Sequence, residues 1–106
     1  MKLLIILLSI PLLCLGQETY KIDCTTYYKD SCYSHGGNMV KRSTKNKKEF
    51  LKLKGYDKCP AGYEIGHIIP LSRGGTDCPD NMQLLTVAEH RKKTANERKK
   101  VTLKTN

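Results

Sequence analysis

The sequence predicts a small single domain of the α+β class. Its 106 residues are enough for one domain. One segment rich in β-branched and aromatic residues, 63–69, lies between two segments that have helix-capping signals, 43–54 and 86–98. We therefore expect a helix followed by strand, loop, strand and helix. A disulfide-tied N-terminal segment is expected to precede them.

The first 16 residues, MKLLIILLSIPLLCLG, have the pattern of a secretory signal peptide. Lys2 precedes an apolar core from Leu3 to Leu13, and cleavage is expected after Gly16. The apolar run is too short to cross a membrane, which takes about 20 residues. We therefore expect an exported, extracellular protein with no stable membrane insertion after cleavage.

The segment 17–42 is rich in tyrosine and cysteine, and we expect short extended stretches joined by loops. Four cysteines follow the leader: Cys24, Cys32, Cys59 and Cys78. An even number in a small exported protein predicts two disulfides. A structural zinc site is the alternative, but there is no C-x-x-C pair. Cys24–Cys32 and Cys59–Cys78 are the most local of three possible pairings, and the sequence does not decide among them.

The segment RSTKNKKEFLKLKGY predicts the first helix. Ser43 or Thr44 can cap its N-terminus, because both side chains accept hydrogen bonds from free backbone N–H groups. Phe50 and two leucines give it a narrow apolar stripe. We expect the helix to run to about Lys54 and to end at Gly55.

The predicted hairpin begins with YEIGHII, residues 63–69, a strand bounded by Gly62 and Pro70. The loop PLSRGGTDCPDN is dense in turn-forming residues, and MQLL forms the second strand. Thr86 and Glu89 then form a capping box, which opens a helix to about Arg98. The remaining tail is basic.

Three polar residues, His67, Asn81 and His90, are separated by 14 and 9 positions. Each alone has an ordinary structural explanation. Together they fall at the end of the first strand, at the start of the second and in the first turn of the helix. A hairpin followed by a helix would bring such residues to one point.

The segment CPAGYEIGHIIPLSRGGTDCPDNMQLLTVAEHRKKTANER resembles the HNH endonuclease motif, also known as the ββα-metal or His-Me finger. It shares the strand histidine, the loop with two glycines and an aspartate, the DN-x-Q-L-L stretch and the helix histidine. The likeness covers about residues 42–98. It implies that residues 43–106 form an HNH-like nuclease core with a basic C-terminal tail.

The resemblance implies a role for each residue of the triad. His67 is the general base, which takes a proton from the water that attacks the scissile phosphorus. Asn81 fixes the loop so that His67 points correctly. His90 is a ligand of a divalent metal ion (Mg, Mn, Ni or Zn), which stabilises negative charge in the transition state.

Gly66 departs from the family pattern, because the family usually has a metal-binding Asp or His immediately before the base. Three explanations remain open. Water and substrate phosphate complete the metal shell, or Glu64 supplies a ligand from the same face of the strand. Alternatively, the finger has lost catalysis and only binds.

The formal net charge of +9 would attract nucleic acid, an anionic membrane surface or an acidic polymer, and solubility alone is the alternative explanation. The candidate phosphate-binding residues are Arg73, Arg91, Lys92, Lys93 and Arg98. The leading hypothesis is a monomeric, secreted, metal-dependent endonuclease that cuts DNA, or RNA, with little sequence selectivity. The alternative is a secreted cationic nucleic-acid-binding protein built on a catalytically degenerate HNH finger.

Overall fold

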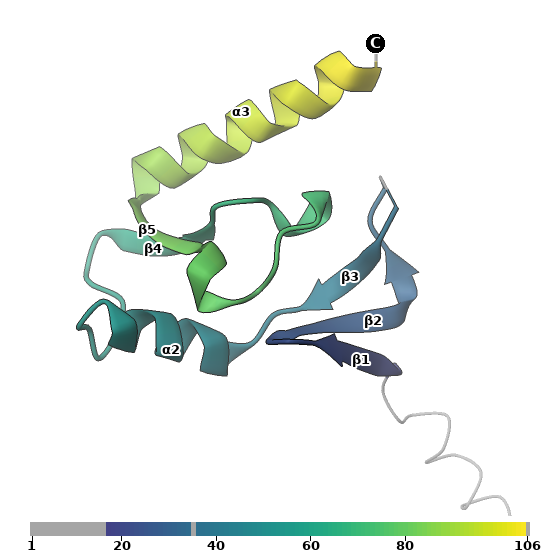
Figure 1. The fold of residues 1–106 in the computed structure, drawn as a ribbon. Coiled ribbons are helices and arrows are strands. Elements are labelled where there is room, and N and C mark those ends of the chain that lie inside the picture. Colours follow the sequence, from purple (N-terminus) through teal and green to yellow (C-terminus); the bar gives the residue numbers. More distant parts are fainter. Residues whose placement is uncertain (1–16, 35, 106) are drawn as a thin grey trace, which may run out of the picture.

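A computed structural model describes residues 17–34 and 36–105 as a small α+β domain with two sheets and two α-helices (Figure 1). This confirms the predicted fold class. The predicted signal peptide, residues 1–16, lies outside the described residues. In the part of the chain that the structure describes, no helix is both long and apolar enough to cross a membrane.

The N-terminal segment forms a three-stranded antiparallel sheet in the order β1-β2-β3 (Figure 1). Its strands are β1 (Thr19–Ile22), β2 (Thr25–Cys32) and β3 (Asn38–Lys41). A two-residue turn joins β1 to β2, and its Asp23 has a φ of 53°, a value that aspartate tolerates better than most residues. The sequence predicted extended stretches here but not their pairing.

Helix α2 (Thr44–Leu53) begins and ends where the sequence predicts. The Ser43 side chain accepts a hydrogen bond of 3.1 Å from the backbone N–H of Asn46, which satisfies one free donor of the first turn. Gly55 follows the helix with a φ of 86°, in the left-handed region that glycine adopts without strain.

The hairpin pairs β4 (Tyr63–His67) with β5 (Met82–Thr86) in antiparallel register. Its long loop contains two short 3₁₀ turns, η1 (Leu71–Arg73) and η2 (Pro79–Asn81). The first strand was predicted to reach residue 69 but ends at 67. The backbone N–H groups of Ile68 and Ile69 donate to the backbone and side-chain oxygens of Asn81 instead of to a strand partner.

Helix α3 (Val87–Thr105) directly follows β5 (Figure 1). The capping box is present, because Thr86 N–H donates to Glu89 at 2.8 Å and Glu89 N–H donates to the Thr86 hydroxyl at 3.1 Å. The backbone N–H of Thr86 and then its side chain lower the pKa of Glu89. The helix extends past its predicted end at Arg98, since no glycine or proline follows to stop it.

The hydrophobic core is small. Phe50 and Leu51 of α2 pack against Met82 of β5, and all three are buried. Partly buried side chains of the hairpin and of the preceding loop complete the cluster: Cys59, Ile65 and Leu84. A core of this size predicts that covalent and polar contacts carry a large share of the stability.

The disulfide joins Cys24 to Cys78, with Cα atoms 5.4 Å apart and 54 positions of sequence between them. The prediction of two disulfides is wrong for the described residues, because Cys32 and Cys59 are free thiols. Neither of the two most local pairs left open by the sequence, Cys24–Cys32 and Cys59–Cys78, is formed. The reason is geometric: Cys24 and Cys32 lie at opposite ends of β2, whose eight residues span about 26 Å. The bridge ties the first sheet to the loop of the hairpin.

Candidate functional site

His67, the last residue of β4, is held by a buried carboxylate. Its Nε2 lies 2.9 Å from Oδ1 of Asp77, and the two side chains are 11% and 1% exposed. A carboxylate oxygen accepts, so a hydrogen on Nε2 would complete this bond and would leave the lone pair of the neutral ring on Nδ1. An imidazole held in this way can accept a proton at one defined atom.

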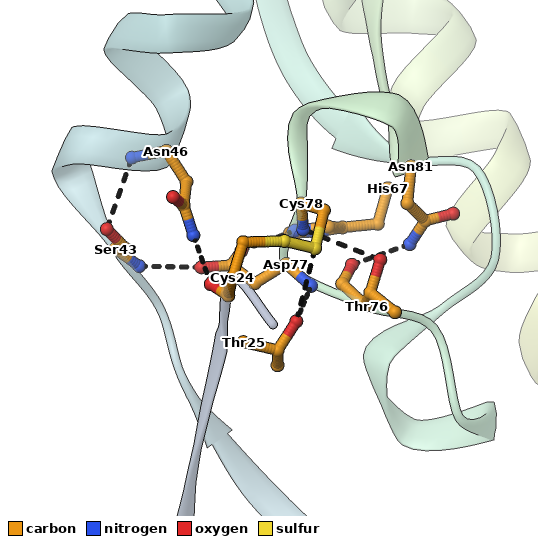
Figure 2. The surroundings of a disulfide bond; sticks show 9 residues. All are labelled: Cys24, Thr25, Ser43, Asn46, His67, Thr76, Asp77, Cys78 and Asn81. Carbon is orange, nitrogen blue, oxygen red and sulfur yellow. Dashed lines mark hydrogen bonds and ion pairs between the residues drawn. A yellow bond between two sulfur atoms is a disulfide. The ribbon is translucent and has the colours of Figure 1, made fainter. Parts of the chain in front are cut away.

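The N-terminal part of the chain holds Asp77 in place (Figure 2). Its Oδ2 accepts a hydrogen bond of 2.7 Å from the backbone N–H of Ser43, and its own N–H donates to Thr25 Oγ1 at 3.0 Å. The next residue, Cys78, forms the disulfide with Cys24. The carboxylate is therefore bonded to Ser43 and His67, while Thr25 and the disulfide hold the backbone that carries it.

Asn81 joins the two ends of the hairpin loop. Its amide nitrogen donates to the carbonyl oxygens of Ile69 at 3.0 Å and Thr76 at 2.7 Å, and its Oδ1 accepts from Ile69 N–H at 2.9 Å. The loop passes so close here that a Cβ at Gly75 would meet the carbonyl oxygen of Ile69 at 1.9 Å. The asparagine thus organises the backbone beside His67 and does not line the cavity described below.

His90 lies in the first turn of α3, and its two nitrogens have different surroundings. Nδ1 is 2.9 Å from Oε1 of Glu64, with side chains that are 35% and 49% exposed. Nε2 faces Gly66, because a Cβ placed there would lie 3.3 Å away. Glu64 therefore lies at the opposite edge of the ring from Nε2, which favours a supporting role over a shared-ligand role.

The two histidines line one cavity of about 200 Å³. The face of α3 that contributes to it presents residues at helical spacing, 90, 93, 94 and 97. The other lining side chains come from the loop and from the N-terminal part: Tyr33, Arg42, His67, Pro70, Leu71 and Ser72. The structure thus places His67 and His90 in the lining of the same cavity.

The predicted phosphate-binding residues flank this cavity. Arg91 and Arg98 line a neighbouring cavity of about 360 Å³ that also includes His90. Arg73 and Lys92 line another of about 620 Å³, between the loop and α3. Lys93 lines both this cavity and the one with the histidines.

Arg73 and Lys93 each contact Glu97. Arg73 donates to the backbone carbonyl of Glu97 at 2.6 Å, and Lys93 forms an ion pair with the Glu97 carboxylate. The Arg73 contact ties the loop to α3, whereas the Lys93–Glu97 pair lies within α3. The charge of Lys93 is therefore partly compensated, whereas Arg91 and Lys92 are exposed.

His90 could bind a divalent cation as its one protein ligand. A histidine whose Nδ1–H is bonded to a carboxylate, with Nε2 left over, is the usual arrangement of a metal-binding imidazole. Over residues 17–34 and 36–105, the structure contains no group of three or more His, Cys, Asp or Glu that could hold a metal. Water and phosphate oxygens would therefore complete the shell, as they often do for magnesium.

Two residues of the site were missed in the sequence. Asp77 was noted as part of the loop pattern, but its contact with His67 depends on tertiary structure. Arg42 precedes the helix cap and lies far from the triad in sequence, yet it lines the same cavity. A buried aspartate cannot be identified from one sequence, since aspartates are mostly exposed.

Comparison with known proteins gives one result for the chain. Residues 54–96 match the model of the family described as HNH endonuclease. The match contains the hairpin and the first half of α3, and it excludes the N-terminal sheet and α2. No curated protein and no solved structure matches the chain.

Proposed function

The chain carries an HNH endonuclease domain at residues 54–96, and from this premise we propose that the protein is an exported, metal-dependent endonuclease. Its substrate would be DNA, or RNA, cut with little sequence selectivity. The observation that carries the proposal is that His67 and His90 line one cavity. Export is supported by the leader at residues 1–16.

In the proposed reaction, His67 acts as the general base. Its Nδ1 accepts a proton from a water molecule, whose oxygen attacks the scissile phosphorus as the bond to the 3′ oxygen breaks. Asp77 stabilises the imidazolium that forms, while the Nε2–H bond stays intact. Asn81 keeps the loop, and with it the strand end that carries His67, in one conformation.

His90 would hold the cation through Nε2, with Glu64 orienting the ring from Nδ1. When bound, the cation would stabilise the charge that grows on the phosphate and on the leaving 3′ oxygen. One nitrogen ligand among oxygens is compatible with Mg, Mn, Ni or Zn.

Substrate would be held mainly by its backbone. Arg91, Lys92 and Arg98 flank the cavities on α3, and Arg42 lines the cavity of the two histidines. Cations that contact phosphates position nucleic acid without reading its sequence. Binding should weaken steeply as salt concentration rises.

The decisive experiment compares oxidised protein lacking residues 1–16 with its His67→Ala variant. Both are incubated with plasmid and with RNA in Mg²⁺, Mn²⁺, Ni²⁺ or Zn²⁺, and with chelator. We expect cleavage that the chelator abolishes and that falls by about 10²- to 10⁴-fold in the variant. Lys48→Ala on the exposed face of α2 is the control and should cut normally. Equal cleavage by His67→Ala would refute the assignment of the base.

A second candidate is a nucleic-acid-binding protein without catalysis. The observation that favours it is the glycine beside His90, which leaves one protein ligand where the family usually has two. This candidate predicts salt-sensitive gel retardation of DNA or RNA with no cleavage in any of the four metals. The same experiment therefore separates the two functions.

A further inference from the structure

We infer that Asp77 is a positioning residue of the proposed nuclease: it fixes the tautomer of His67, so that Nδ1 is the basic nitrogen. The inference rests on the proposed function for its catalytic meaning. Its structural part, the protonation of Nε2, can be measured independently of any activity.

The first argument is the geometry of the pair. Asp77 Oδ1 is 2.9 Å from His67 Nε2, and the aspartate side chain is 1% exposed. Solvent therefore does not compete for this hydrogen bond, and a charge-assisted bond in a dry environment is strong. A carboxylate accepts only, so it selects the tautomer with hydrogen on Nε2.

The second argument is the number of contacts that fix the carboxylate. Ser43 N–H binds the other oxygen at 2.7 Å, and Thr25 Oγ1 accepts from the Asp77 N–H at 3.0 Å. Among the described residues, no buried side-chain nitrogen or oxygen lacks a partner. Asp77 therefore cannot rotate away from His67 without leaving buried donors unpaired.

The third argument is where these contacts come from. Thr25, Ser43 and Cys24 all lie outside residues 54–96, the part that matches the HNH family. The N-terminal sheet and the start of α2 thus support the base through Asp77 (Figure 2). This gives residues 17–34 and 36–43 a function in catalysis that is separate from binding substrate.

The position of Asp77 at Nε2 of His67 determines the path of each proton in the proposed reaction. The water proton moves to Nδ1, which faces away from Asp77, and later passes to solvent. The Nε2 proton stays between His67 and Asp77 throughout. An amide at position 77 would keep its oxygen on the Ser43 N–H and would therefore present its NH2 group to Nε2. That donor would favour hydrogen on Nδ1 and would block the base.

The test combines nuclear magnetic resonance with kinetics. Two-bond ¹H–¹⁵N spectra of wild-type protein report which nitrogen of His67 is protonated, and we expect Nε2. In Asp77→Asn we expect the proton on Nδ1 and a kcat about 10²- to 10⁴-fold lower, with KM little changed. Asp80→Asn, the same change at an exposed residue of the same loop, is the matched control and should retain both the tautomer and kcat.

The outcomes are distinct. Hydrogen on Nδ1 of His67 in wild-type protein would overturn the inference, even if Asp77→Asn failed to fold. An unchanged kcat in a folded Asp77→Asn would also overturn it. If wild-type protein does not cleave nucleic acid, the proposed function fails, but the tautomer still decides whether Asp77 positions the ring.

Discussion

Each of the two histidines that line the cavity is bonded to a carboxylate at 2.9 Å, but the two pairs lie in different surroundings. The His67–Asp77 pair is 11% and 1% exposed, and the His90–Glu64 pair is 35% and 49% exposed. The first pair lies within the hairpin, and Asp77 also contacts Ser43 and Thr25 of the N-terminal part. The second lies between β4 and α3, at the surface.

The difference teaches that equal distances do not imply equal effects. In the dry pair the hydrogen bond has no aqueous competitor, so removing one partner leaves a buried group unpaired. In the exposed pair, water can replace either partner, and the interaction contributes little to stability. We therefore expect changes near His67 to alter stability and kcat, and changes near His90 to alter mainly metal affinity.

The largest effect is expected from loss of the disulfide beside Asp77. The bridge closes a loop of 54 positions, so Cys24→Ser with Cys78→Ser should lower the free energy of unfolding by about 4 kcal/mol. Because the small core contributes little other stability, part of the variant should be unfolded, and cleavage should fall as well. Denaturant unfolding and plasmid cleavage, each with and without reductant, measure both effects.

Cys32→Ser is the matched control for the disulfide variant, because that thiol is free and exposed. It should leave the unfolding midpoint unchanged. A wild-type protein that is equally stable in reductant would contradict the assigned bridge.

A smaller effect is expected at the exposed pair. Glu64→Ala removes the acceptor that orients His90, and affinity for Mn²⁺ or Zn²⁺ should fall by about 10- to 100-fold. Titration calorimetry measures the affinity without reference to cleavage. Glu49→Gln, an exposed acid on α2, is the control, and unaltered metal affinity in Glu64→Ala would argue against the orienting role.

The smallest effect is expected from restoring an acid beside His67. A Cβ at Gly66 would lie 3.3 Å from His90 Nε2 and 3.0 Å from Leu85 Cδ1, the flexible end of a side chain. Gly66→Asp should therefore be tolerated and should tighten metal binding by about 10-fold. Gly66→Ala adds the Cβ alone, so it should show no gain. If the two variants bind metal equally, the glycine does not limit the site.

Local signals in the sequence predicted most of the hairpin and both helices. The Ser43 cap and the Thr86–Glu89 capping box are short-range hydrogen bonds, and both occur as expected. The prediction of two disulfides was wrong, and local separation was a poor guide to the pairing because Cys24 precedes β2 and Cys32 ends it. Strand length, not sequence distance, kept Cys24 from Cys32.

The family resemblance identified His67 and His90, and both line one cavity. It did not identify the carboxylates that orient the two rings. Asp77 contacts residues 34 and 52 positions away, and such contacts leave no periodic signal in one sequence. Strand alternation suggested Glu64 as a metal ligand, and that role stays a prediction. Its bond to Nδ1 of His90 needed the relative placement of β4 and α3.

The sequence distance spanned by the bridge also affects how the protein reaches its folded state. Cys32 is synthesised soon after Cys24, and Cys78 only much later. During oxidation the first thiol that Cys24 can pair with is therefore not Cys78, its partner in the folded protein. Thiol–disulfide exchange must then resolve any early pairing, through attack by a free thiolate. Cys32 and Cys59, the free thiols of the described residues, can take part in this exchange. The yield of correctly bridged protein should therefore depend on a redox buffer that permits exchange.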